Sequence, residues 1–173
     1  LVAQVHSPAL PLYLANINAE NQLVVAGSIA GMAALADLAK AAGAGAVKVL
    51  AVSVPSHCEL LAAPAARLAE AFARVDVRRP RVRYLSSSSA RLILDADKLR
   101  DDLAYNMCRV VNWHHTLQTA FERGVRLHLE LPPGAVLSGL ARRVFTGGNV
   151  IAFQGARLDT LDVLLSQASY QDR

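Results

Sequence analysis

The sequence predicts an α/β protein, and two observations support that fold class. Short apolar runs alternate along the chain with longer stretches in which apolar residues recur every three or four positions. Glycine, proline and asparagine, which favour turns, separate these stretches. Alternation of strands with helices is typical of α/β folds. The 173 residues, of which 53% are hydrophobic and 18% charged, can bury one apolar core or two small ones.

The first part of the chain is predicted to be two strands followed by a helix. Residues 11–16 and 22–26 have strand-like patterns, and the asparagine-rich link between them tolerates turn conformations. Ser28 is a good N-cap for the helix that follows. Gly43 stands where that helix can end in a left-handed conformation.

The next stretch draws attention to His57. The apolar run 47–54 predicts a strand buried on both faces, and Pro55 ends it because proline has no N–H to donate. A helix over 58–75 follows, with Pro64 in its first turns. Open α/β folds keep their chemistry at such strand-to-helix junctions. His57 is therefore either a general base near pH 7 or an imidazole that binds backbone at a helix start.

The remaining elements follow the same two periodicities. Further strands are expected at residues 80–85, 125–131 and 149–153, and further helices at 95–106, 111–123, 135–144 and 158–166. Asp95 or Asp97 is expected to cap the first of these helices. The serine run 86–89 is interpreted as a polar strand end and turn rather than a nucleophile. The predicted order is β-β-α-β-α-β-α-α-β-α-β-α.

Composition and charge narrow the function classes. The net charge is +4, and the one basic cluster, at residues 78–83, has no interleaved aromatic residues, so an acidic partner fits better than nucleic acid. Two isolated cysteines favour a reducing, cytoplasmic location. No Cys/His spacing resembles a zinc site, and no apolar run approaches the ~20 residues of a membrane span. Because the chain begins with Leu1 rather than methionine, we expect a fragment of a longer protein.

Most familiar catalytic patterns are absent from the sequence. There is no glycine-rich phosphate loop and no Gly-x-Ser-x-Gly nucleophile elbow. Several carboxylates are interpreted as surface or capping groups: Glu20, Glu59, Glu70 and Glu130. The other histidines are interpreted as surface or helix-face residues: His6, His114, His115 and His128. His57 remains as the candidate catalytic residue.

Four motifs, in the right order, resemble those of malonyl-CoA:acyl carrier protein transacylases. Val52-Ser53-Val54-Pro55-Ser56-His57-Cys58 is similar to the histidine motif of that family. The other three matching stretches are Asn16-Ile17-Asn18 with residues 22–27, residues 109–113, and residues 130–140. Residues 14–20 and 104–106 look closest to the epsilon subunit of malonate decarboxylase, which loads malonyl onto the carrier protein of that enzyme.

The resemblance implies a fold and a division of the chain. The family fold is an α/β-hydrolase-like large domain with an inserted ferredoxin-like subdomain, and this chain resembles its carboxyl-terminal part. Residues 1–50 would be the remainder of the small ferredoxin-like subdomain. Residues 51–173 would be the carboxyl-terminal part of the large transacylase domain.

The resemblance also implies an activity: transfer of malonyl from malonyl-CoA to the pantetheine thiol of an acyl carrier protein, through a seryl ester and by ping-pong kinetics. No bound cofactor is implied, since the coenzyme A thioester is a substrate. His57 would be the base, oriented by a backbone carbonyl near Asn106, and Asn16, Asn18 and Gln22 would line the thioester or pantetheine channel. The nucleophile half of the family has no counterpart here, so the chain alone is expected to be inactive.

Three alternatives stay open at this point. The chain could belong to the fatty-acid or polyketide version of the enzyme rather than to malonate decarboxylase with its other subunits. It could be a non-catalytic docking module that binds a carrier through the basic cluster. It could also be part of a Ser/His thioesterase or hydrolase.

Overall fold

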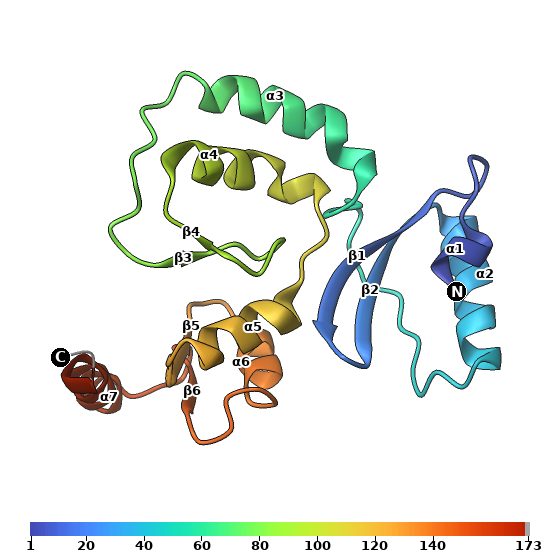
Figure 1. The fold of residues 1–173 in the computed structure, drawn as a ribbon. Helices are drawn as coiled ribbons and strands as arrows, with labels where there is room; N and C mark the ends of the chain where they lie inside the picture. Colours follow the sequence, from blue (N-terminus) through green and yellow to red (C-terminus); the bar gives the residue numbers. More distant parts are fainter. Residues whose placement is uncertain (172–173) are drawn as a thin grey trace. The chain divides into compact units, whose positions relative to one another are not determined.

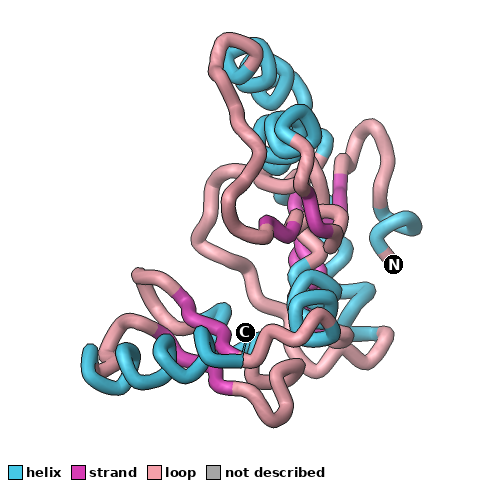
Figure 2. Tube along the Cα trace, turned by 60° about the vertical axis from the view of Figure 1, so that its left-hand side comes forward, coloured by secondary structure: helices cyan, strands magenta, loops and turns pink. Residues whose placement is uncertain are grey.

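The computed structural model describes residues 1–171 and has a mixed α/β composition, as the sequence predicts (Figure 1). It divides into two compact units, of which the first is Leu1–Trp113 and the second begins at His114. Most of the strands are shorter than most of the helices (Figure 2). None of the helices in the described part of the chain is long and apolar enough to cross a membrane.

The first unit begins with a small α+β layer. Its elements are α1 (Val2–Val5), β1 (Leu12–Ala19), β2 (Gln22–Gly27) and α2 (Ile29–Ala41). The two strands pair antiparallel, and α2 packs against β2 and α1. The Ser28 hydroxyl accepts the Gly31 N–H at 3.1 Å, and Gly43 adopts a φ of +86° after the helix. The predicted hairpin, N-cap and helix end are therefore confirmed.

The predicted buried strand at residues 47–54 is wrong for this structure. The segment between α2 and the next helical turn is a loop (Figure 1). Val49 is 80% exposed and Val52 is 69% exposed. A strand forms only where a neighbouring strand takes up its backbone hydrogen bonds, and among the described residues no strand pairs with this segment.

The rest of the first unit contains two packed helices and a minimal strand pair. Its elements are η1 (Glu59–Leu61), α3 (Ala62–Phe72), β3 (Tyr84–Leu85), β4 (Leu92–Ile93), α4 (Ala96–Tyr105) and η2 (Asn106–Cys108). The helices α3 and α4 lie side by side (Figure 1). Pro64 stands in the first turn of α3, as predicted. The Asp95 side chain caps α4 by accepting the Lys98 N–H at 2.9 Å.

One contact connects the hairpin to the segment that follows η2. The Ile17 N–H donates to the Val111 carbonyl at 2.8 Å, and the Val111 N–H donates to the Ala15 carbonyl at 2.9 Å. These two bonds add a parallel bridge at Asn16 to the strand β1. The hairpin and the turn at Asn106 are thereby fixed within one unit.

The second unit is a parallel strand pair with helices around it. Its elements are α5 (Trp113–Glu122, which starts at the last residue of the first unit), β5 (Leu127–Glu130), α6 (Val136–Ala141), β6 (Asn149–Ala152) and α7 (Leu158–Gln171). The two strands pair in parallel, and α6 packs on both. Its apolar core is formed by Leu117, Leu140, Ala141, Phe145 and Leu161.

The end of β5 buries a charged residue and exposes the apolar residue that follows it. Glu130 is only 5% exposed, whereas Leu131 is 71% exposed. The Glu130 carboxylate accepts the N–H groups of Leu137 and Ser138, at 3.0 and 2.6 Å. Burial raises the pKa of this carboxyl, but the hydrogen bonds from Ser138 and Leu137 outweigh burial, and the net shift is downward. Glu130 is thus a capping group, one of the two roles expected for it.

Candidate active site

His57 lies in the loop just before η1 and is held by the turn at η2. Its backbone has a φ of +63°, in the left-handed region that only a few per cent of non-glycine residues adopt. Its N–H donates to the Met107 carbonyl at 2.7 Å. Its ring Nδ1 lies 2.9 Å from the Asn106 carbonyl oxygen. Strained backbone of this kind persists where the surroundings hold it, and it concentrates at functional sites.

The contact with Asn106 decides which nitrogen of the neutral ring can act as a base. A carbonyl oxygen only accepts hydrogen bonds, so Nδ1 must carry the proton when it binds the Asn106 oxygen. The lone pair of the neutral ring is then on Nε2. A backbone carbonyl here does what the carboxylate does in a Ser-His-Asp triad, which is to hold one tautomer and one ring orientation.

The residue after His57 stabilises the same turn of the backbone. Cys58 is 3% exposed, and its thiol donates to the Pro55 carbonyl at 3.2 Å. Burial is the main cause that raises the pKa of this thiol. A buried thiol with a raised pKa is a structural group rather than a nucleophile. The sequence 55–58 therefore forms a closed turn in which Cys58 is a buried structural thiol and His57 is the candidate base.

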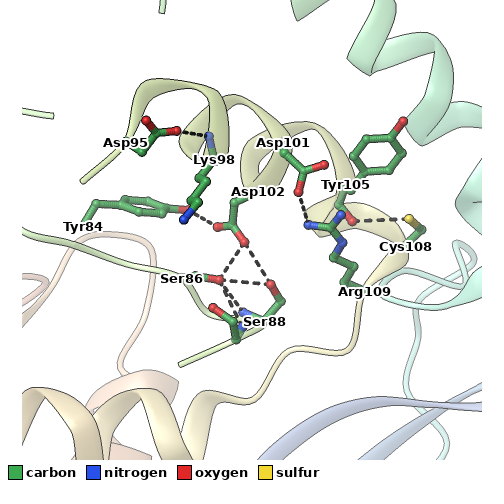
Figure 3. A network of polar contacts seen from close by, with 11 residues as sticks. Tyr84, Ser86, Ser88, Asp95, Lys98, Asp101, Asp102, Tyr105, Cys108 and Arg109 are labelled. Atoms are coloured by element: carbon green, nitrogen blue, oxygen red, sulfur yellow. Dashed lines mark hydrogen bonds and ion pairs between the residues drawn. The ribbon is translucent and has the colours of Figure 1, made fainter. Parts of the chain in front are cut away.

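A buried carboxylate organises the other side of the η2 turn (Figure 3). Asp102 of α4 is 3% exposed and accepts three hydroxyl groups. The Tyr84 hydroxyl lies at 2.7 Å, the Ser86 hydroxyl at 2.6 Å and the Ser88 hydroxyl at 3.0 Å. Burial, followed by the hydrogen bond to Asp102, raises the pKa of Tyr84 well above its usual value. The serine run is thus a folded turn clamped to α4.

A cavity of about 710 Å³ opens beside this carboxylate. It is lined by Ser88, Ser89, Ile93, Asp97, Lys98, Asp101, Asp102, Arg109 and Val110. The Arg109 guanidinium donates to Asp101 at 2.6 Å in this wall. His57 is not part of the lining, so the cavity does not by itself mark the reactive centre. Among the described residues, no cluster of three or more His, Cys, Asp or Glu side chains could hold a metal ion.

The three residues predicted to bind substrate lie on the hairpin. Asn16 and Asn18 are half-buried on β1, and Gln22 is exposed at the start of β2. The bridge between Asn16 and Val111 ties β1 to the segment that follows η2. None of the three hydrogen-bonds to His57 in the described part of the chain. The structure thus brings His57 and Asn106 together, and it places the hairpin residues on a neighbouring, connected element.

Sequence reasoning missed Ser87 and Asp102. The Ser87 hydroxyl accepts a hydrogen bond from the Asn106 side-chain amide at 3.0 Å. Asp102 stands next to Asp101, which is exposed, and periodicity did not show which of the two faces inward. Side chains three residues apart share one helix face, but Asp101 has Ala104 and Asp102 has Leu99 at that spacing, so the sequence held no signal that separates the two.

Comparison with known proteins gives one consistent result. The malonyl CoA-acyl carrier protein transacylase of Haemophilus influenzae is 33% identical over 129 residues, which are 75% of this chain and 41% of that protein. The Bacillus subtilis transacylase is 31% identical over 131 residues, 76% of this chain and 41% of that protein. In sequence, the chain is similar to the malonyl transacylases over about two fifths of their length. No family model matches the chain.

Solved transacylase structures share the fold. FabD from Acinetobacter baumannii superposes with a TM-score of 0.85 at 31% identity, over 96% of this chain and 54% of that chain. A malonyl-transacylase solved in complex with its type II PKS acyl-carrier protein superposes with a TM-score of 0.86 at 29% identity, over 96% of this chain and 53% of that chain. The chain thus spans about half of these transacylases.

Proposed function

We propose that the chain is the carboxyl-terminal part of a malonyl transacylase and supplies its general base. The observation that carries this proposal is the hydrogen bond of 2.9 Å between His57 Nδ1 and the Asn106 carbonyl. It joins the two residues that the resemblance to transacylases assigns to the catalytic base and to the group that orients it. Nε2 is then left with the lone pair that proton transfer requires.

The proton transfers follow from that tautomer. Nε2 takes the proton of a serine hydroxyl as the serine oxygen attacks the malonyl thioester carbonyl. The tetrahedral intermediate collapses, the C–S bond breaks, and Nε2 returns the proton to the departing coenzyme A sulfur. In the second half-reaction Nε2 takes the proton of a pantetheine thiol, and that sulfur attacks the seryl ester. The serine oxygen leaves and regains the proton from Nε2.

The serine belongs to the half of the transacylase that this chain does not span. The sequence has no Gly-x-Ser-x-Gly elbow, so the 173 residues alone are proposed to be inactive. Asn16, Asn18 and Gln22 are proposed to line the channel for the thioester or the pantetheine arm. The coenzyme A thioester is a substrate, and we propose no bound cofactor.

The exposed apolar loop at residues 47–54 supports the proposal that the chain is part of a larger domain. Residues 47–54 have the composition of a buried strand yet expose their valines. We propose that they become a strand of the α/β-hydrolase-like sheet when the missing half supplies its neighbours. Residues 1–50 are then the remainder of a ferredoxin-like subdomain, and residues 51–173 belong to the large domain.

The carrier is proposed to be that of malonate decarboxylase, with this chain acting in its epsilon subunit. Residues 14–20 and 104–106 support this choice through their resemblance to that subunit. The relative solved with a type II PKS acyl-carrier protein makes the fatty-acid or polyketide carrier the alternative. A transfer assay with each carrier as acceptor separates the two, because the cognate carrier gives the higher kcat/KM.

The proposal is tested with a chimera in which this chain replaces the matching part of the Haemophilus influenzae transacylase. We expect malonyl transfer from malonyl-CoA to a pantetheine-bearing carrier, and His57→Ala is expected to lower kcat by about 10²–10⁴-fold. His115→Ala, at an exposed histidine, is the matched control and should retain the rate. A folded chimera that works equally well without His57 would contradict the proposal.

The basic cluster at residues 78–83 favours a second candidate function, which is docking of an acidic carrier. All four of its arginines are exposed in the loop between α3 and β3: Arg78, Arg79, Arg81 and Arg83. Within the described part of the chain, Arg78 pairs with Asp76, and the other three have no acidic partner. Such a cluster attracts negative surfaces in a salt-dependent way. Carrier binding that weakens with salt and survives His57→Ala would support docking without catalysis.

A further inference from the structure

The side chain of Asn106 has a contact that the proposed mechanism does not use. Only the backbone carbonyl of Asn106 binds His57. Its side-chain Nδ2 donates to the Ser87 hydroxyl at 3.0 Å, across a separation of 19 residues. The Ser87 carbonyl also accepts the Asn112 N–H at 2.6 Å. One serine therefore holds both the start of the η2 turn and the segment that leaves it.

Ser87 is itself held on both sides by its neighbours. The hydroxyls of Ser86 and Ser88 bind the Asp102 carboxylate, as Figure 3 shows. The Ser88 and Ser89 N–H groups point back to the Ser86 hydroxyl at 3.3 and 3.1 Å. Ser86 has no exposed surface. The turn that carries Ser87 is thus fixed in part by two hydrogen bonds to a buried carboxylate, and such charge-assisted bonds are stronger than bonds between neutral groups.

These contacts form a closed circuit. Asp102 belongs to α4, and Asn106 begins the η2 turn directly after that helix. The circuit runs from Asp102 through the serine turn to Ser87, across to Asn106, and back along the chain to Asp102. Asn106 is therefore restrained by the backbone of η2 and also by its own side chain. Such double restraint is what keeps a supporting group within the small tolerance that a catalytic arrangement needs.

We propose that Ser87 is a positioning residue for His57. By binding the Asn106 amide, Ser87 holds the Asn106 carbonyl in the place where it receives the Nδ1 proton. It thereby maintains the tautomer that leaves the lone pair on Nε2. This inference rests on the proposed function only for its catalytic meaning, since the effect on the His57 tautomer is a property of the chain itself.

The test measures the tautomer directly. In the 173-residue chain with ¹⁵N-labelled histidine, the nitrogen chemical shifts report which ring nitrogen of neutral His57 carries the proton. We expect the Nδ1-protonated form to dominate in the unaltered chain. Ser87→Ala is expected to shift the tautomer equilibrium roughly fivefold toward Nε2 protonation, which is the effect of one net hydrogen bond.

Matched variants separate positioning from general damage to the fold. Ser87→Thr keeps a hydroxyl and should restore the tautomer, and Ser89→Ala, at an exposed serine of the same run, should leave it unchanged. Asn106→Ala keeps the carbonyl but removes the amide, so it should reproduce the effect of Ser87→Ala. The double variant should then show no further shift, because both changes remove the same contact.

The outcomes distinguish this inference from the proposed function. A Ser87→Ala chain that keeps its amide fingerprint and the Nδ1-protonated tautomer overturns the inference, whatever the chimera does. Strictly additive effects of Ser87→Ala and Asn106→Ala overturn it as well. A tautomer shift in a chain whose chimera transfers no malonyl supports the inference and counts against the proposed function. In an active chimera, the same substitution should lower kcat with little change in KM.

Discussion

Replacement of Asp102 by alanine should be among the most destabilising changes in the first unit. The carboxylate is 3% exposed and accepts hydroxyls at 2.6, 2.7 and 3.0 Å. Each hydrogen bond to a charged group contributes about 1.5–3 kcal/mol. The loss is partly offset, because the variant no longer buries a charge, and burying an ion costs several kcal/mol. The half-buried hydroxyls of Tyr84 and Ser88 can also recover water as a partner, whereas Ser86 is fully buried and cannot.

The balance of these effects predicts that Asp102→Ala lowers the free energy of unfolding by about 3 kcal/mol. Asp101→Ala is the matched control, since it makes the same change one residue earlier on the same helix. Asp101 is 51% exposed, and its ion pair with Arg109, which is 40% exposed, should contribute less than about 1 kcal/mol. Asp102→Asn keeps the shape and one acceptor oxygen, so it should fall between the two.

Guanidinium denaturation checks this prediction. The single tryptophan, Trp113, provides a fluorescence signal at the end of the first unit, and far-ultraviolet circular dichroism follows the helices. The denaturant slope must stay the same for the free energies to be comparable. Two results would refute the reasoning that burial makes this carboxylate important for stability. One is an equal loss of unfolding free energy in Asp101→Ala and Asp102→Ala, and the other is a loss under about 1 kcal/mol in Asp102→Ala.

Three further predictions concern pH, backbone space and thiol chemistry. The pKa of Tyr84 is raised above its ordinary value of 10, so the folded chain keeps a phenol proton that the unfolded chain loses above that pH. The free energy of unfolding should therefore fall as pH rises above 10, and it should fall less in Tyr84→Phe. A Cβ at Gly27 would collide with the Pro11 carbonyl, so Gly27→Ala should lower the unfolding free energy by about 1–3 kcal/mol. Nothing lies near a Cβ at Gly139 in α6, so Gly139→Ala should raise the unfolding free energy by about 0.5–1 kcal/mol. Thermal unfolding of both glycine variants checks these two predictions. Alkylation of Cys58 by iodoacetamide should be slow and should have a pH midpoint above that of an ordinary thiol. A fast reaction near pH 7 would contradict the burial of this thiol.

Local signals in the sequence were sufficient for the helix ends. Ser28 and Asp95 cap their helices through contacts three residues away, and Gly43 ends a helix through its own backbone conformation. Each of these outcomes depends on neighbours in the chain, so a single sequence contains the information. Motif resemblance then indicated that a carbonyl near Asn106 lies against His57, and the structure has a hydrogen bond between these two residues, 49 positions apart. The catalytic roles of both residues stay predictions.

The strand at residues 47–54 shows where sequence reasoning stops. Its apolar residues have the pattern of a buried strand, but a strand also needs partner backbones, and the described chain provides none beside it. Asp101 and Asp102 show a second limit. Adjacent aspartates are equivalent in composition, and only the packing of α4 against the rest of the unit decides which one is buried.

The sequence by itself determined the α/β class, the helix caps and the choice of His57 as the candidate base, because these follow from periodicity, neighbouring side chains and a recognisable motif. The tertiary structure alone decided that Nδ1 is the nitrogen of His57 that lies against the Asn106 carbonyl, that Asp102 binds the serine turn, and that Ser87 reaches Asn106. Those contacts join residues 14 to 49 positions apart in the chain. Hydrogen bonds of this kind depend on distances of a few ångströms that only the folded backbone sets.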